Sequence, residues 1–180
     1  MSKKWRFRYY DDPILRQHSE PIEEITEEIQ ELARFMIDYA DNHNGIGLSA
    51  IQVGVPIRMF VLRDYIVLPD GQWTVSPPKV FINPKIVWKS KETTIDTEGC
   101  MSLPGISPGP IERPFKAVIE ALDINGNPFS EEREGLNARV SFHENDHLNG
   151  VLQIDRLPPA VRKKITPQLN EIKKKYHGDG

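Results

Sequence analysis

The sequence contains only one cysteine, Cys100, so no intrachain disulfide can form. It contains no apolar run near the roughly 18 residues of a membrane-spanning helix. Its basic start, "MSKKWRFRYY", lacks the apolar segment of a secretory signal. These absences predict a protein of the reducing cytoplasm with no membrane partner.

The net charge is also small, because 23 Lys and Arg nearly balance 26 Asp and Glu to give −3 at pH 7. This balance gives no broad electrostatic reason to bind nucleic acid, and we predict no DNA partner. The hydrophobic and charged fractions, 38% and 27%, are ordinary for a globular chain. No repeat or linker interrupts the 180 residues, which predicts a single domain over residues 1–180.

Apolar periodicity predicts three long helices, and Asp12-Pro13 predicts a short one near Pro13. The predicted long helices cover residues 22–43, 136–150 and 158–176. The predicted strands, rich in branched and aromatic residues, cover residues 57–63, 79–88 and 116–124. Residues 65–78 are expected to form an exposed loop or hairpin, and the Pro- and Gly-rich residues 103–114 a loop without regular structure. The order predicts an α+β fold of antiparallel β-sheets packed around a central helix, with an N-terminal and a C-terminal helix.

The central predicted helix carries the segment "FHENDHLNG", in which His143 and His147 follow an H-E-x-x-H pattern with Glu144 between them. Histidines at i and i+4 lie one turn apart on one side of a helix, so both can reach one metal ion. They continue an apolar stripe from Leu136 and Val140, which predicts that they face the core. The alternative is a pair of hydrogen-bonded core histidines. A metal is favoured because two buried imidazoles without partners are costly.

A catalytic metal site usually has three protein ligands and an open position. No histidine follows His147 in "LNGVLQIDRLPP", so the third ligand is sought upstream, at Cys100 in "DTEGCMSLPG". Two imidazoles and a thiolate suit zinc or iron(II). A small buried core residue remains the alternative for this cysteine.

The segment "NGIGLSAIQVG" contains Gly45-x-Gly47-x-x-Ala50, a spacing that resembles a dinucleotide-binding loop. That interpretation is rejected because the segment follows a helix and leads to a strand, the reverse of the required order. A helix-terminating turn is the simpler alternative. Gln52 lies in this turn, and its side-chain amide could donate to a developing oxyanion.

The three motifs together resemble those of the peptide deformylase family, which has GxGLAAxQ, EGCxS and HExDH in this order. Here they read "GIGLSAIQ", "EGCMS" and "HENDH", and the likeness runs from "DDPILR" through "FINPKI" to "DHLNGVLQID". The resemblance implies removal of the formyl group from the N-terminal formyl-methionine of newly synthesised polypeptides, with release of formate.

The resemblance also implies a role for each motif. The metal ligands would be Cys100, His143 and His147, holding one divalent ion, with Fe2+ physiological and Zn2+, Ni2+ or Co2+ as substitutes. Glu144 would act as general base and acid. The amide of Gln52 and the backbone N–H of Met101 would donate to the formyl oxygen, and Ile46 and Gly47 would line the cleft for an extended substrate.

Several details depart from the family pattern or stay open. Ser49 replaces the usual Ala, Ile51 the frequent Pro, Met101 the usual Leu and Phe142 a common Gln, while no ligand is lost. We expect Asp146 to pair with Arg113 or another base, against a solvated surface pair. We expect Glu98 to accept a bond beside the metal site, against simple exposure.

Two further alternatives concern function. A metallopeptidase would use the same H-E-x-x-H helix but a different third ligand, and a retired deformylase would only bind nascent chains or ribosomes. The basic last helix, with Lys173, Lys174 and Lys175, could dock on ribosomal RNA, although clustered lysines are more often a solvated face.

Overall fold

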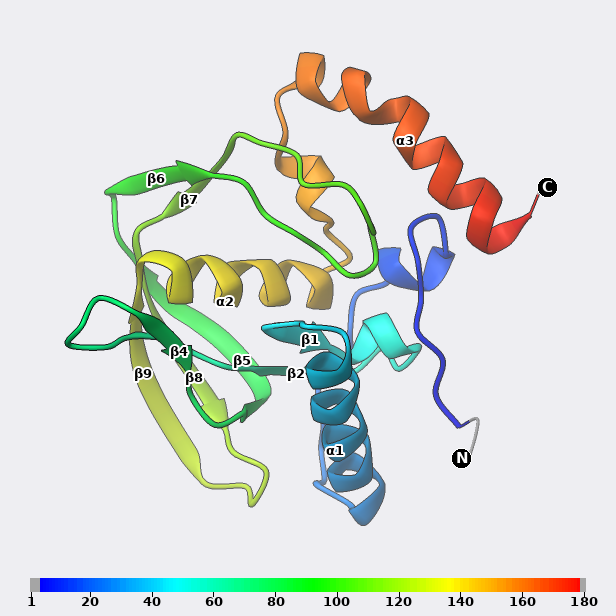
Figure 1. The fold of residues 1–180 in the computed structure, drawn as a ribbon. Helices are drawn as coiled ribbons and strands as arrows, with labels where there is room; N and C mark the ends of the chain where they lie inside the picture. The colour runs from blue at the N-terminus through cyan, green and yellow to red at the C-terminus, as the bar shows by residue number, and fades with distance from the viewer. Residues whose placement is uncertain (1–3, 179–180) are drawn as a thin grey trace.

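The computed structural model describes residues 4–178 (Figure 1). These residues form three α-helices: α1 (Glu27–Asn42), α2 (Gly135–Leu148) and α3 (Pro159–His177). Three short 3-10 helices cover Pro13–Arg16, Ala50–Val53 and Gln153–Arg156. Among the described residues, no helix is both long enough and apolar enough to cross a membrane.

The largest sheet is antiparallel and has the strand order β1-β2-β5-β8-β9. Its strands are β1 (Gly47–Ser49), β2 (Met59–Leu62), β5 (Lys79–Lys89), β8 (Lys116–Leu122) and β9 (Pro128–Glu134). Two antiparallel pairs stand apart from it: β3 (Tyr65–Val67) with β4 (Trp73–Val75), and β6 (Thr93–Asp96) with β7 (Ile111–Pro114).

Helix α2 crosses the middle of the molecule between the large sheet and the β6–β7 layer (Figure 1). Phe142 and Leu148 of α2 pack with Phe60, Phe81 and Ile119 of the sheet in one buried cluster. This arrangement confirms the predicted α+β class and the central position of the H-E-x-x-H helix. Because α2 is covered on several sides, its polar residues are buried and need partners.

Helix α1 begins at Glu27, five residues later than the sequence predicted. Asn83 explains the difference, because its side chain accepts a hydrogen bond from the Ile22 N–H and donates one to the Ile22 carbonyl, both at 2.8 Å. These bonds hold the chain in an extended path. Thr26 then caps the helix by accepting from the N–H of Ile29.

Two other expectations were wrong in part. Residues 103–114 are not entirely irregular, because the last four form β7 and pair with β6. A two-stranded edge pairing tolerates proline, so the composition misled the prediction. Leu136, predicted on the core-facing stripe, is 48% exposed and lines the cavity described below. The hairpin expected within residues 65–78 is present as β3 and β4.

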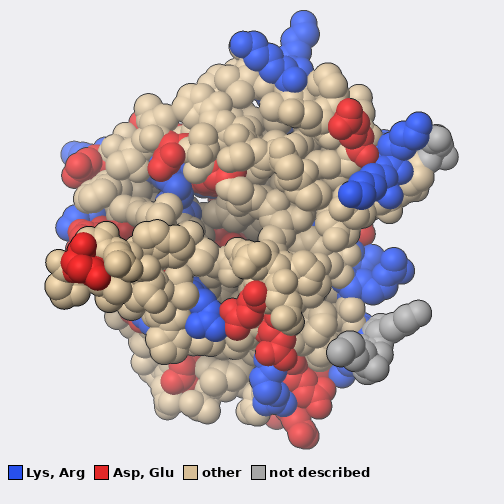
Figure 2. All heavy atoms as spheres, in the orientation of Figure 1, with Lys and Arg blue, Asp and Glu red and all other residues tan. Residues whose placement is uncertain are grey.

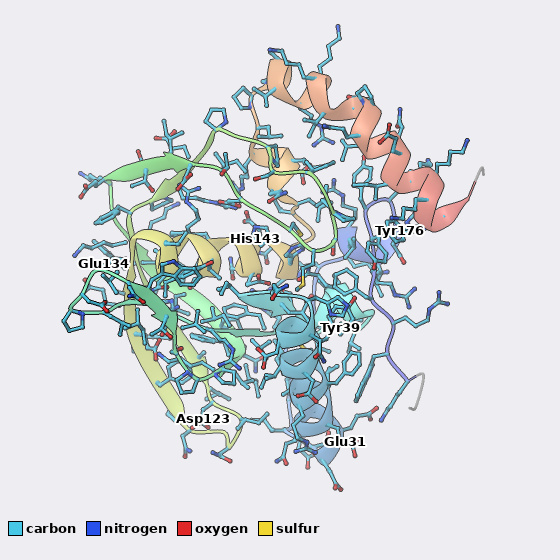
Figure 3. The ribbon with its side chains drawn as sticks, viewed as in Figure 1. Glu31, Tyr39, Asp123, Glu134, His143 and Tyr176 are labelled. Atoms are coloured by element: carbon cyan, nitrogen blue, oxygen red, sulfur yellow. The ribbon has the colours of Figure 1, made fainter. Side chains whose placement is uncertain are left out.

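The N-terminal segment around Tyr9 contacts both the last helix and two segments that carry site residues. The N–H of Arg8 donates to the Gln52 carbonyl, and the N–H of Tyr10 donates to the Ser102 carbonyl, each at 2.8 Å. Tyr9, between them, stacks on Tyr176 of α3 with ring centroids 3.6 Å apart. Figure 3 shows Tyr176 on the side of α3 that faces this segment.

Candidate active site

Cys100, His143 and His147 converge at one point in the interior. One potential ligand atom from each lies within 4.8 Å of the others, and Cys100 Sγ is 3.3 Å from Nε2 of His147. The two histidines come from successive turns of α2, where Figure 3 labels His143 at the middle of the helix. Cys100 comes from the loop between β6 and β7.

The donor set fits a divalent metal. Bonds of about 2.0–2.3 Å at tetrahedral angles place neighbouring N and S ligands roughly 3.3–3.8 Å apart, close to the Cys100–His147 separation. Burial lowers the pKa of His147 well below its ordinary value. A neutral imidazole is the form that binds a metal. These three residues could therefore hold one ion.

The orientation of His143 is set by Glu98. Glu98 Oε2 lies 3.0 Å from Nδ1 of His143, which leaves the other ring nitrogen for the cluster. Glu98 is 6% exposed and also accepts hydrogen bonds from Arg113 and Arg139. Burial alone would raise the pKa of Glu98, but the hydrogen bonds from Arg113 and His143 lower it. The expectation that Glu98 accepts a bond beside the site is confirmed.

Asp146 holds the outer side of α2 to the same network. It accepts from Arg113 at 2.6 Å and from Arg156 at 2.6 and 3.0 Å. Asp146 is 7% exposed, so the pairing with Arg113 is confirmed and the solvated alternative is wrong. Arg113 joins Asp146 to Glu98, and one guanidinium thus links β7 both to α2 and to the loop that carries Cys100.

Glu144 points away from this network, towards β1. Ser49 Oγ lies 2.7 Å from Glu144 Oε2 and 3.0 Å from the Glu144 carbonyl. Oε1 faces Gly47, where a Cβ would come within 2.5 Å of it. Burial raises the pKa of Glu144, while the neighbouring His143 and the Ser49 hydrogen bond oppose the shift. A carboxyl with a raised pKa is suited to accept and return a proton.

Gln52 and Met101 both lie close to Cys100 on the cavity wall. Gln52 Nε2 donates to Ser102 Oγ at 3.0 Å and lies 3.7 Å from Cys100 Sγ, while Oε1 accepts from the N–H of Ser49. Met101 lines the cavity, and its Cε would lie 2.7 Å from a Cβ on Gly45. No role was predicted for Ser102, although it stands within the EGCMS motif.

A cavity of about 590 Å³ opens onto these groups, within the usual range of about 300–1,000 Å³ for small-ligand pockets. Its wall includes the predicted binding residues Ile46 and Gly47, together with Glu144 and His143. Apolar side chains complete the wall, among them Leu103, Ile106, Leu136 and Val140. The structure therefore brings every predicted site residue to the cavity or directly behind it.

Strand β1 offers a backbone edge to this cavity. It ends the large sheet and pairs with β2 on one side. Arg63 donates to the Ile46 carbonyl, so the backbone groups of Ile46 face β2, and those of Gly47 and Ser49 face away. Gln52 accepts from the Ser49 N–H. Gly47 thus has its backbone groups directed away from β2.

The site combines the imidazoles of His143 and His147, the thiol of Cys100 and the carboxylate of Glu144 at one open cavity. This combination is that of a metal-dependent hydrolase. The model of the polypeptide deformylase family matches residues 5–163. The chain belongs to this family.

Similar proteins cover nearly the whole chain. The peptide deformylase of Rhizobium meliloti is 41% identical over 163 residues, 91% of this chain and 90% of that protein. The peptide deformylase of Thermotoga neapolitana is 38% identical over 174 residues, 97% of this chain and 99% of that protein. The structure of peptide deformylase 1B from Arabidopsis thaliana with an inhibitor has a TM-score of 0.84 and 37% identity, covering 96% of this chain and 92% of that one.

Proposed function

We propose that this chain removes the formyl group from the N-terminal formyl-methionine of newly synthesised polypeptides and releases formate. The observation that carries the proposal is the grouping of Cys100, His143 and His147 with Glu144 at the wall of one cavity. Family membership supports the same reaction. The catalytic unit would be a single domain over residues 1–180.

Cys100, His143 and His147 would hold one divalent ion, which when bound supplies Lewis-acid polarisation of a carbonyl oxygen and activation of water. A mixed sulfur and nitrogen donor set suits iron(II) and zinc. We propose Fe2+ as the physiological ion, with Zn2+, Ni2+ or Co2+ able to substitute.

Glu144 would move the proton in this reaction. Its Oε2 is held by Ser49, so Oε1, on the Gly47 side, is the atom that takes the proton of the attacking water. The same oxygen then returns the proton to the nitrogen of the departing amine. Gln52 Nε2, already directed towards Cys100, and the backbone N–H of Met101 would donate to the formyl oxygen as negative charge develops there.

The substrate would bind as an added strand at the free edge of β1. The backbone groups of Gly47 that face away from β2 are placed to pair with an extended peptide. The absence of a side chain at Gly47 lets that peptide approach Glu144, because a Cβ there would overlap the carboxylate. The apolar cavity wall would receive the methionine side chain.

Formate release from a formyl-Met tripeptide, with the unformylated tripeptide as a parallel substrate, tests this function. We expect formate from the first and no cleavage of the second, whereas a metallopeptidase would cut both. Glu144→Ala should abolish turnover while elemental analysis of anaerobically prepared protein still finds one ion per chain. A variant with unchanged turnover would contradict the role of Glu144.

A second proposal concerns partners. Lys and Arg side chains stand out from the edge of the molecule where α3 lies (Figure 2), and we propose that the lysines of α3 dock on ribosomal RNA within the cytoplasm. Lys173 also forms an ion pair with Asp11 at 3.0 Å, so the positive charge of Lys173 is partly neutralised within the chain. Charge reversal at Lys173 and Lys175 should reduce co-sedimentation with ribosomes at low salt, and unchanged co-sedimentation would refute the docking.

A further inference from the structure

Met101 is the only partly exposed methionine among the described residues 4–178. Its side chain lines the active-site cavity, which is open to solvent. Met36 and Met59, the other methionines in this part of the chain, are fully buried. The family usually has leucine at position 101, which is similar in volume to methionine but contains no sulfur. This chain therefore places one accessible thioether beside its reactive groups.

The thioether of Met101 lies against Gly45, just before β1. A Cβ added to Gly45 would lie 2.7 Å from Met101 Cε and 2.9 Å from Met101 Sδ. The N–H of Gly45 donates to the Ala40 carbonyl at 2.8 Å, so this glycine is held to the end of α1. Met101 also packs against the buried apolar cluster between α1 and the large sheet. The sulfur thus has a tight contact on the Gly45 side and the cavity as its open side.

Both partners of this contact adjoin groups that the proposed reaction needs. Gly45 precedes Ile46 and Gly47, which line the cavity. Met101 follows Cys100, and its backbone N–H is the proposed donor to the formyl oxygen. A misplacement of about 1 Å in a reacting geometry can lower a rate about 100-fold. A change in the chemistry of the Met101 sulfur would therefore reduce turnover.

We propose that Met101 is a site of oxidation to methionine sulfoxide by hydrogen peroxide, and that the sulfoxide lowers the activity. A lone pair of Sδ attacks one peroxide oxygen, the O–O bond breaks and an S–O bond forms. The proton of the transferred oxygen passes to the departing hydroxide, which leaves as water. The sulfur loses two electrons and the peroxide gains them. The new oxygen either presses on Gly45 or projects into the cavity, where it adds a polar group beside the apolar wall.

Peroxide treatment of the zinc-loaded holoenzyme tests the proposal, because Zn2+ has no redox chemistry of its own. After treatment, dithiothreitol restores any reversibly oxidised Cys100, and formate release from formyl-Met-Ala-Ser is measured. Peptide mass mapping follows the gain of one oxygen atom on Met101. We expect kcat/KM of the modified fraction to fall about tenfold. Met101→Leu should keep most of its own untreated kcat/KM, and Met101→Gln, with a polar side chain of similar length, should show the loss without peroxide.

Met59→Leu is the matched control, because Met59 is fully buried, and it should be inactivated at the rate of the parent. The inference is overturned if Met101→Leu loses activity as fast as the parent, since another residue such as Cys100 would then be responsible. It is also overturned if Met101 gains no oxygen, or gains it with kcat/KM unchanged. The loss of activity rests on the proposed function, and no formate before treatment would refute that function. Mass mapping would still test the oxidation, so the two failures are distinct.

Discussion

Replacing Ser49 by Ala tests how this chain positions its general base. Ser49 is fully buried, and its hydroxyl lies 2.7 Å from Glu144 Oε2 and 3.0 Å from the Glu144 carbonyl. Alanine is the usual residue of the family at this position, so the variant should fold. Without the hydroxyl, the carboxylate can rotate away from the side of Gly47.

The size of the effect follows from the bond that is lost. A hydrogen bond to a charged group contributes about 1.5–3 kcal/mol, and part of this remains available through small shifts of Glu144. A loss of about 1–2 kcal/mol at the transition state lowers kcat about 5- to 30-fold. KM for a formyl-Met peptide should stay within about twofold, because Ser49 lies behind the cavity rather than in its wall.

Ser141→Ala is the control for this experiment. Ser141 is also fully buried, and its hydroxyl donates to the Asn137 carbonyl within α2. It should lose similar stability in urea unfolding and keep kcat. The reasoning fails if Ser49→Ala retains kcat, or if Ser141→Ala loses as much activity.

Three other predictions concern the surroundings of the site. Glu98→Gln should weaken metal affinity about 10- to 100-fold in competition with a chelator, because the partner that orients the ligand histidine loses its charge. Gly47→Ala should fold but lower kcat/KM about 100-fold, since its Cβ would lie 2.5 Å from Glu144 Oε1. Burial would raise the pKa of Asp64, but the hydrogen bond from Lys79 lowers it, so this carboxylate stabilises the fold at neutral pH. That contribution is lost as the pH falls through the lowered value, and Asp64→Asn should flatten the fall in urea midpoint between about pH 5 and pH 2.

The sequence predicted the parts of the fold that depend on local pattern. The H-E-x-x-H helix and the apolar stripe of α1 follow a 3.6-residue period, and the β3–β4 hairpin follows its turn residues. The start of α1 could not be predicted, because it depends on Asn83, 61 residues from Ile22. Strand β7 was missed because its pairing with β6 overrides a composition rich in proline.

In the candidate site, too, the residues within local motifs were predictable and their distant partners were not. Its metal and proton-transfer residues stand within short motifs, so their chemistry was visible in the sequence. Their partners come from distant segments: Ser49 reaches Glu144 across 95 positions, and Arg139 reaches Glu98 across 41. No local pattern encodes such bonds. Leu136 was misplaced because it lies in the first turn of α2, where the helix faces the open cavity instead of the packed core.

The stacking of Tyr9 on Tyr176 joins the N-terminal segment to α3, next to the segments that carry Gln52 and Ser102. Residues on either side of Tyr9 are hydrogen-bonded to the carbonyls of Gln52 and Ser102, so the last turn of α3 is linked through Tyr9 to the backbone that carries the amide donor. Tyr176 lies beyond residue 163, where the family match ends. The part of the chain beyond the family match therefore supports, through Tyr9, the backbone at Gln52 and Ser102 from outside the cavity.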